Sequence, residues 1–321
     1  MEAGSPGLYG YIRASNFSKM NILILGSEGF IGRYLVNYFI SCGHVITGCD
    51  IVESSPATYQ YQKLSILSSD FDSLFDGNFF DVCINAAGSG NVAYSIAHPL
   101  SDFEGNTASV AKVLDTLRKQ QPSCKYVHIS SAAVYGNPLQ LPIVETDKPA
   151  PLSPYGYHKW ISEISCLEYY QIFALPIAII RPFSVFGNGL KKQILWDICT
   201  KLMAADTVEL FGTGNESRDF IHINDLVLLI DLVIAKSNFN MGIYNAASGT
   251  ETSIHQIARI FEKHFDDSKT IHFSGQQKKG DPLNWVADIT KVKALGFTNK
   301  TLLEKGIAEY IHWFKLNAGE Q

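Results

Sequence analysis

A tyrosine and a lysine stand four residues apart in the segment SPYGYHK, as Tyr155 and Lys159. On a helix, this spacing places both side chains on one face. A phenol with a pKa of about 10 is a poor base at neutral pH, but a nearby ammonium group favours the phenolate and lowers that pKa. Tyr155 could then remove or deliver a hydroxyl proton while a hydride moves to or from a nicotinamide ring. Lys159 could also hold the nicotinamide ribose.

Two serines, Ser130 and Ser131, end the apolar segment KYVHIS and its continuation in HISSAAVYG. Ligands of open α/β sheets bind at the carboxyl ends of the strands, so a hydroxyl group here can hydrogen-bond the oxygen atom that reacts. We expect one serine to do this and the other to serve the local structure. Ala86 and Ala87 follow another apolar segment, FDVCIN, and their small side chains would let a cofactor approach.

A dinucleotide site is predicted near the start of the chain, where GSEGFIG follows the apolar segment NILIL. Gly26 permits a tight turn, Gly29 lets the backbone approach a pyrophosphate, and Gly32 allows a helix to pack closely on a strand. A helix that begins at Phe30 and Ile31 would direct its free N–H groups at the phosphates. We therefore expect these five residues to bind the cofactor.

Asp50 ends the next apolar segment, 18 residues after Gly32. A carboxylate at this place can accept hydrogen bonds from both ribose hydroxyls of the adenosine, and it would repel a 2′-phosphate. Residues 51–60 contain neither Lys nor Arg, so the sequence favours NAD over NADP. Arg33 is the exception, because it follows the glycines and could reach a 2′-phosphate.

The elements that must position these residues alternate between strands and helices. Continuous apolar runs are typical of buried parallel strands, and their alternation with helical patterns indicates βαβ units. The sequence therefore predicts an α/β fold with a Rossmann doubly wound parallel sheet. The predicted strands are Asn21–Leu25, His44–Cys49, Phe80–Asn85, Lys125–Ser130 and Pro176–Arg181, and the predicted helices are Phe30–Ser41, Thr107–Lys119 and Tyr155–Phe173.

The chain divides unevenly in this interpretation. Residues 20–182 form mainly the NAD-binding Rossmann domain, and residues 183–321 form mainly a smaller C-terminal substrate lobe, interleaved with the end of the sheet. Turn-rich pieces such as FGNG and FGTGN mark the second part. Residues 1–19 lack the apolar core of a signal peptide, and Met20 directly precedes a strand, so we interpret them as an extension or cloning remnant.

Bulk composition excludes several classes of function. Hydrophobic residues make up 46% and charged residues 18% of the 321 residues, and the net charge is −5. These values are typical of a globular protein and give no electrostatic reason to expect nucleic acid or an anionic membrane as partner. No run of about 18 apolar residues predicts a membrane span. Six cysteines without a C-x-x-C pair indicate reduced thiols in the cytoplasm, and nine histidines show no metal-ligand spacing.

Together with RPFSVFGNG and RDFIHINDL, these motifs resemble the extended short-chain dehydrogenase/reductases. More narrowly, they resemble the NAD-dependent epimerase/dehydratase family, of which UDP-galactose 4-epimerase is a well-known member. The likeness runs from about Met20 to Phe314, and the motifs occur in the family's order. The resemblance implies an enzyme that binds NAD and a nucleotide-diphosphate sugar. It also implies a homodimer built through the helices at Thr107–Lys119 and Tyr155–Phe173.

The resemblance implies roles for individual residues. Ser131, Tyr155 and Lys159 match the family's catalytic serine, tyrosine and lysine. Arg218 matches an arginine that binds the substrate diphosphate, which suits the fork of a guanidinium group. The remaining substrate positions are Ser130 beside the catalytic serine, Ser184 in place of an asparagine, Phe211 near the base, Lys278 in place of a second phosphate-binding arginine, and Trp285 near the sugar.

Two reactions remain open at this point. The leading hypothesis is carbon-4 epimerisation of a nucleotide sugar through a 4-keto intermediate, with NAD tightly held. The alternative is NADH- or NADPH-dependent reduction of a nucleotide-linked 4-keto-6-deoxy sugar. Elimination of water is not expected, because the acids of the sugar 4,6-dehydratases are absent. A non-catalytic dinucleotide sensor would have lost Ser, Tyr or Lys, and all three are present.

Overall fold

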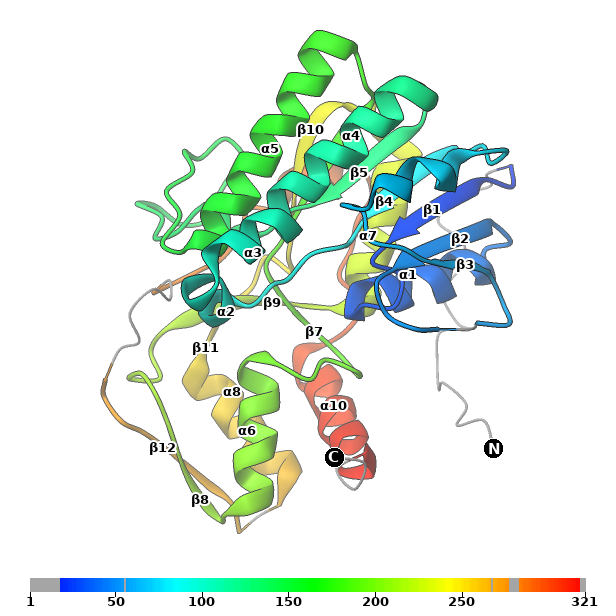
Figure 1. The fold of residues 1–321 in the computed structure, drawn as a ribbon. Coiled ribbons are helices and arrows are strands. Elements are labelled where there is room, and N and C mark those ends of the chain that lie inside the picture. Colours follow the sequence, from blue (N-terminus) through cyan, green and yellow to red (C-terminus); the bar gives the residue numbers. More distant parts are fainter. Residues whose placement is uncertain (1–17, 55, 267, 277–282, 318–321) are drawn as a thin grey trace.

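The computed structural model describes residues 18–54, 56–266, 268–276 and 283–317 (Figure 1). Its centre is a seven-stranded sheet with the strand order β10-β6-β5-β4-β1-β2-β3, and all neighbouring strands are parallel. The strands are β1 (Asn21–Leu25), β2 (Val45–Asp50), β3 (Gln60–Lys63), β4 (Val82–Asn85), β5 (Lys125–Ile129), β6 (Ile177–Pro182) and β10 (Asn240–Ala246). The order proceeds outwards in both directions from β1 and β4, so the predicted doubly wound Rossmann fold is confirmed.

Helices cover both faces of this sheet (Figure 1). Helices α1 (Phe30–Ser41) and α7 (Ile223–Lys236) contact each other on one face, and α4 (Ser109–Gln120) and α5 (Pro154–Phe173) contact each other on the other. Ile22 and Ile24 belong to the core under α1 and α7, whereas Leu23 and Leu25 belong to the core under α4 and α5. Since alternate side chains of β1 are buried on opposite faces, its sequence is apolar throughout.

The second lobe has a core of its own, shared by α6 (Gln193–Ala204), α8 (Ile254–Phe265) and α10 (Leu303–Asn317). Two small sheets complete it, with the orders β11-β9-β7 and β12-β8. Their strands are β7 (Ser184–Phe186), β8 (Thr207–Leu210), β9 (Ser217–His222), β11 (Glu251–Ser253) and β12 (Thr270–Phe273). Strand β10 comes from this half of the chain but forms the edge of the large sheet. The domain division at residue 182 stays a prediction, and residues 1–17 lie outside the described residues.

The segment between β4 and β5 is more broken than the sequence suggests. Helices α2 (Val92–Ala97) and α3 (Pro99–Phe103) come first, and a π-helical turn, η2 (Glu104–Ala108), then leads into α4. The helix predicted over Thr107–Lys119 therefore begins inside this turn. The other short elements are the 3₁₀ turns η1 (Ser69–Phe75) and η3 (Ala132–Val134), and the helix α9 (Thr290–Ala294). Within the described ranges, no helix is long and apolar enough to cross a membrane.

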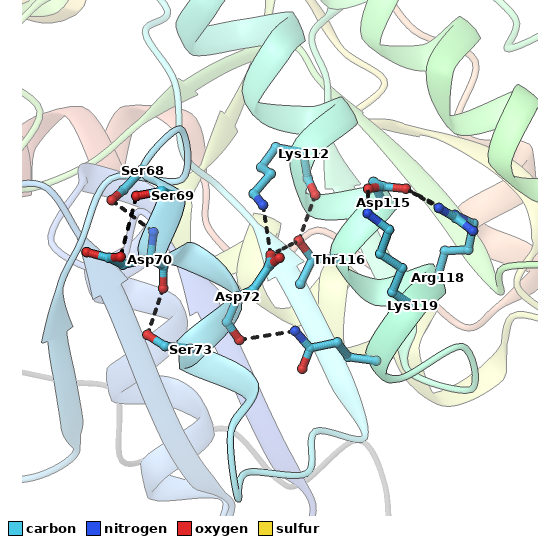
Figure 2. Close-up of polar contacts among 11 residues, drawn as sticks. Ser68, Ser69, Asp70, Asp72, Ser73, Lys112, Asp115, Thr116, Arg118 and Lys119 are labelled. Carbon is cyan, nitrogen blue, oxygen red and sulfur yellow. Dashed lines mark hydrogen bonds and ion pairs between the residues drawn. The ribbon is translucent and has the colours of Figure 1, made fainter.

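A polar network fastens η1 to α4 at the protein surface (Figure 2). Asp72 accepts hydrogen bonds from the Lys112 ammonium at 2.8 Å and from the Thr116 hydroxyl at 2.6 Å. These two hydrogen bonds hold the pKa of the Asp72 carboxyl below its usual value. Exposed ion pairs of this kind each contribute about 1 kcal/mol or less, so we assign the network a role in local order.

Candidate active site

Helix α5 positions Tyr155 and Lys159 through its first turn. The Ser153 hydroxyl accepts the N–H of Gly156 at 3.2 Å, and Pro154 occupies the first helical position, where its missing N–H costs nothing. Lys159 is buried, and its Nζ donates to the carbonyl oxygen of Ile129 at 3.0 Å. This contact joins the lysine to the carboxyl end of β5.

Ser131 follows β5 and caps the turn η3, because its Oγ accepts the N–H of Ala133 at 3.1 Å. Burial raises the pKa of Tyr155 above its usual value; a hydrogen bond from the Ser131 hydroxyl opposes this rise, and Asp102 adds to it. The structure therefore brings Ser131, Tyr155 and Lys159 together at the end of β5.

Burial shifts the pKa values of both residues of this pair. Burial lowers the pKa of Lys159 to about 8, although Asp102 and Glu163 act to raise it. Burial also raises the pKa of Tyr155, because desolvation of the phenolate outweighs the nearby donors in the protein by itself. The expectation that Lys159 favours the phenolate stays a prediction.

A buried carboxylate behind this pair was missed by the sequence analysis. Asp102 lies in α3, and its Oδ2 is 2.6 Å from Nδ1 of His158. Its Oδ1 accepts a hydrogen bond from Asn106 at 3.1 Å, and Asn106 lies in the π-helical turn η2. Asp102 acts to raise the pKa of both Tyr155 and Lys159. A single Asp in a helical segment carries no sequence signal for this position.

Lys192 is a second residue that sequence reasoning missed. A Cβ atom placed on Gly90 would lie 3.6 Å from Nζ of Lys192 and 3.7 Å from the hydroxyl of Tyr155. The two side chains therefore approach the same position from different lobes. Desolvation lowers the pKa of Lys192, and its charge acts to lower the pKa of Lys159. A lysine at a helix start is usually a solvated surface residue, which is why the sequence did not reveal it.

The glycine loop has the close approaches that its spacing predicts. Gly26 has a φ of +75°, and a Cβ atom on it would lie 2.7 Å from the nitrogen of Ala87. A Cβ atom on Gly32 would lie 2.0 Å from the carbonyl oxygen of Gly26. Gly29 is exposed and, among the described residues, no side chain caps α1, so the N–H groups of Phe30 and Ile31 can face phosphates, whereas that of Arg33 donates to the carbonyl oxygen of Gly29.

Asp50 and the alanines lie around this loop. Asp50 ends β2, and its Oδ2 accepts the N–H of Glu28 from within the loop at 3.0 Å. Ala86 and Ala87 follow β4, remain partly exposed, and lie against Gly26. The open helix start, the small residues and the carboxylate together fit a dinucleotide whose adenosine ribose lies beside Asp50.

Ser130 does not belong to this arrangement. It is buried, and its Oγ donates to Oε1 of Glu163 at 2.5 Å. Arg181 donates to the two oxygens of the same carboxylate at 2.9 and 2.6 Å. The substrate contact predicted for Ser130 is therefore corrected: its hydroxyl satisfies a buried ion pair that joins β5, α5 and β6. A buried polar group needs such partners, and the sequence does not identify them.

The residues expected to meet the sugar nucleotide lie in the second lobe. Arg218 in β9 has its guanidinium carbon 5.7 Å from the centre of the Trp285 ring. Trp285 is buried, and its Nε1 donates to the carbonyl oxygen of Gly136 at 2.9 Å. Ser184 is half-buried in β7, and Phe211 is exposed after β8. Lys278 lies outside the described residues.

The model of the NAD dependent epimerase/dehydratase family matches residues 22–247. The chain belongs to this family. A putative UDP-glucose 4-epimerase from Methanocaldococcus jannaschii is 26% identical over 92% of this chain and 99% of its own length. A UDP-glucose 4-epimerase from Mycolicibacterium smegmatis is 25% identical over 92% of this chain and 99% of its own length. Among solved structures, a UDP-glucuronic acid 4-epimerase from Bacillus cereus, with UDP-glucuronic acid and NAD, superposes with a TM-score of 0.84 at 25% identity, covering 92% of this chain and 99% of that one.

These similarities agree with the geometry of the cofactor site. The family is NAD-dependent, and the glycine turn, the uncapped start of α1 and Asp50 suit NAD. NAD is therefore the cofactor, as predicted. Within the described ranges, no group of three or more His, Cys, Asp or Glu residues is placed to hold a metal ion.

Proposed function

We propose that the protein is an NAD-dependent epimerase that inverts carbon 4 of a nucleotide sugar through a transient 4-keto intermediate. The observation that carries this proposal is the convergence of Ser131, Tyr155 and Lys159 beside a dinucleotide loop. The relatives named above as UDP-sugar 4-epimerases cover almost the whole chain and support the same reaction.

In this proposal, Tyr155, Ser131 and Lys159 each have a separate role. NAD, when bound, would supply the hydride acceptor, and a positive charge on its nicotinamide would favour the phenolate of Tyr155. Tyr155 then removes the 4-hydroxyl proton, and Ser131 donates a hydrogen bond to the same sugar oxygen. Lys159 is held at the Ile129 carbonyl, where its ammonium can orient the nicotinamide ribose. After the keto sugar has turned its other face, the hydride would return from the reduced cofactor to carbon 4, and Tyr155 would return the proton to the oxygen.

The second lobe supplies the recognition of the nucleotide sugar in this proposal. Arg218 would bind the diphosphate, because its guanidinium offers several fixed donors to phosphate oxygens. The exposed ring of Phe211 would stack on the base. Trp285 is fixed by its hydrogen bond to Gly136, so it forms a rigid boundary near Arg218.

A homodimer built through α4 and α5 is also proposed, and the outer face of α5 supports it. Tyr157, Ile161 and Ile164 are exposed there, and Leu100 and Phe103 of the adjoining α3 are exposed as well. An apolar patch of this extent on contacting helices is typical of a protein interface. We place the protein in the cytoplasm, because its five buried cysteines form no disulfide within the described residues: Cys49, Cys83, Cys124, Cys166 and Cys199.

The decisive experiment determines the cofactor state of the purified protein. The protein is denatured, the released nucleotide is identified, and UDP-glucose is supplied to fresh protein without added cofactor. An epimerase releases stoichiometric NAD and interconverts the two carbon-4 epimers with none in the medium. A protein that is empty, and that acts only when NADH or NADPH is added with a 4-keto sugar, is instead the reductase that the sequence left open.

A further inference from the structure

Two acidic residues, Glu28 and Asp50, lie at the glycine loop, although the sequence pattern requires only one. Glu28 is the third residue of GSEGFIG, and its side chain is only 12% exposed. Its backbone N–H donates to Oδ2 of Asp50 at 3.0 Å. This hydrogen bond fixes Glu28 next to the carboxylate that faces the adenosine ribose. Burial raises the pKa of Tyr61, and the charges of Asp50 and Glu28 both add to this rise, so the two carboxylates lie in one neighbourhood. A group on the 2′-oxygen of a ribose beside Asp50 would therefore meet negative charge from both residues.

The Glu28 carboxylate also has two partners of its own. Its Oε2 accepts hydrogen bonds from Nε and an Nη of Arg33, at 3.3 and 3.2 Å. Its Oε1 accepts a hydrogen bond from the Tyr59 hydroxyl. Within the described part of the chain, Glu28 is the acidic side chain that forms an ion pair with Arg33. Arg33 is a basic residue that could compensate a 2′-phosphate in this region. Lys63, opposite Asp50 in the pairing of β2 with β3, forms an ion pair with Glu53.

The ion pair with Glu28 makes Arg33 less available to a 2′-phosphate. A 2′-phosphate brings nearly two negative charges, and it binds where a guanidinium can reach it. While Arg33 donates to Glu28, its Nε and one Nη are occupied and its charge is balanced. A phosphate would have to displace Glu28 from Arg33 and would still lie beside two carboxylates. The cost falls on NADP alone, because NAD has a hydroxyl at that position.

We propose that Glu28 is a second determinant of cofactor selectivity, which excludes NADP by binding Arg33 and by placing its charge beside Asp50. This role concerns only the adenosine end of the cofactor. It therefore does not rest on the sugar or on the reaction in the proposed function. It predicts that the residue to change for NADP binding is Glu28 in the glycine loop as well as Asp50.

The test compares the nucleotides that the protein retains. Wild type, E28Q, R33A and E28Q/R33A are incubated at length with equal excess concentrations of NAD and NADP, separated from free nucleotide, and denatured. The NADP-to-NAD ratio is then measured. Glu28→Gln keeps the shape of the side chain and an oxygen for Tyr59, but removes the charge. The measurement requires no turnover and no known sugar.

We expect E28Q to raise the NADP-to-NAD ratio roughly tenfold or more, the scale of a charge-assisted contact to phosphate. The gain should largely disappear in E28Q/R33A, and R33A alone should leave the ratio near that of wild type. An unchanged ratio in E28Q, or a full gain that persists without Arg33, overturns the proposal. Total nucleotide per protein reports folding, and E28A serves as a second variant if E28Q binds neither nucleotide.

Discussion

Tyr155 is the residue on which the proposed chemistry depends most directly. Replacing it with Phe removes the hydroxyl that exchanges the proton but keeps the ring that fills its half-buried position. We expect Tyr155→Phe to lower kcat by roughly 10²–10⁴-fold, the range for loss of a general acid or base. NAD content, measured on the same preparation, should stay near that of wild type. Turnover at the wild-type rate would contradict the mechanism.

Lys159 gives a prediction about pH. Its pKa falls from 10.5 in the unfolded chain to about 8 in the folded protein, because burial disfavours the ammonium. Below about pH 8 both states bind the proton, so the cost of burying the charge is fully present. Between the two pKa values the unfolded chain binds more protons, and stability rises with pH.

The matched variant is Lys159→Met, which removes the titrating group and keeps most of the side-chain volume. Chemical denaturation at pH 7.5 and at pH 9.5 should show that wild type gains stability relative to the variant as the pH rises. All other groups titrate in both proteins, so the difference isolates Lys159. A constant difference between the two pH values would show that burial does not lower this pKa.

At the scale of elements, the turn between β1 and α1 tolerates no side chain at its third glycine. A Cβ atom on Gly32 would lie 2.0 Å from the carbonyl oxygen of Gly26, so α1 must move away from β1. We expect Gly32→Ala to destabilise the protein by at least about 1–3 kcal/mol and to lower its NAD content. Thermal unfolding and nucleotide analysis measure the two effects.

Gly105 provides the control for this prediction. It lies in the turn η2, and a Cβ atom on it meets nothing within 4 Å. Gly105→Ala should therefore leave both stability and NAD content close to those of wild type. Equal losses in the two variants would mean that the backbone, and not the close approach to Gly26, makes these glycines necessary.

The sequence predicts single elements well, but it does not predict side-chain contacts between distant elements. Strand β1 and helix α1 begin and end as predicted, because apolar periodicity and the glycine turn are local signals. The partners of Ser130 are Glu163 and, through it, Arg181, which come from two later elements. No local pattern reveals such a contact. The same holds for Lys192, which reaches the neighbourhood of Tyr155 from the other lobe.

Whether a site residue can be predicted therefore depends on how far along the chain its contact partners lie. Tyr155 and Lys159 share a helical turn, so their spacing alone was enough to place them together. Asp102 reaches His158 across more than fifty residues, and the π-helical turn that helps to orient its partner Asn106 has no composition signal. The catalytic and binding roles themselves stay predictions until variants are measured.

At the scale of the whole molecule, α5 carries Tyr155 on one face and exposed apolar side chains on the other. Ile161 is 36% exposed between Tyr157 and Ile164, one turn away on either side, whereas Leu316 on α10 is 71% exposed. Of these two residues, exposure alone would favour Leu316 as the interface residue. The grouping of apolar side chains selects Ile161, because an interface core must exclude water over a continuous area.

Substituting glutamate for Ile161 or for Leu316 tests which of the two residues lies in the dimer interface. Ile161→Glu would bury an unpaired charge in a dimer, which is costly enough to shift the chain towards monomers, whereas Leu316→Glu should leave the dimer intact. Size-exclusion chromatography with light scattering measures the mass of each variant and of wild type. A monomeric wild type, or a dimer that survives Ile161→Glu, would contradict this interface. If the dimer forms through α5, the helix that positions Tyr155 is held by packing on both of its sides.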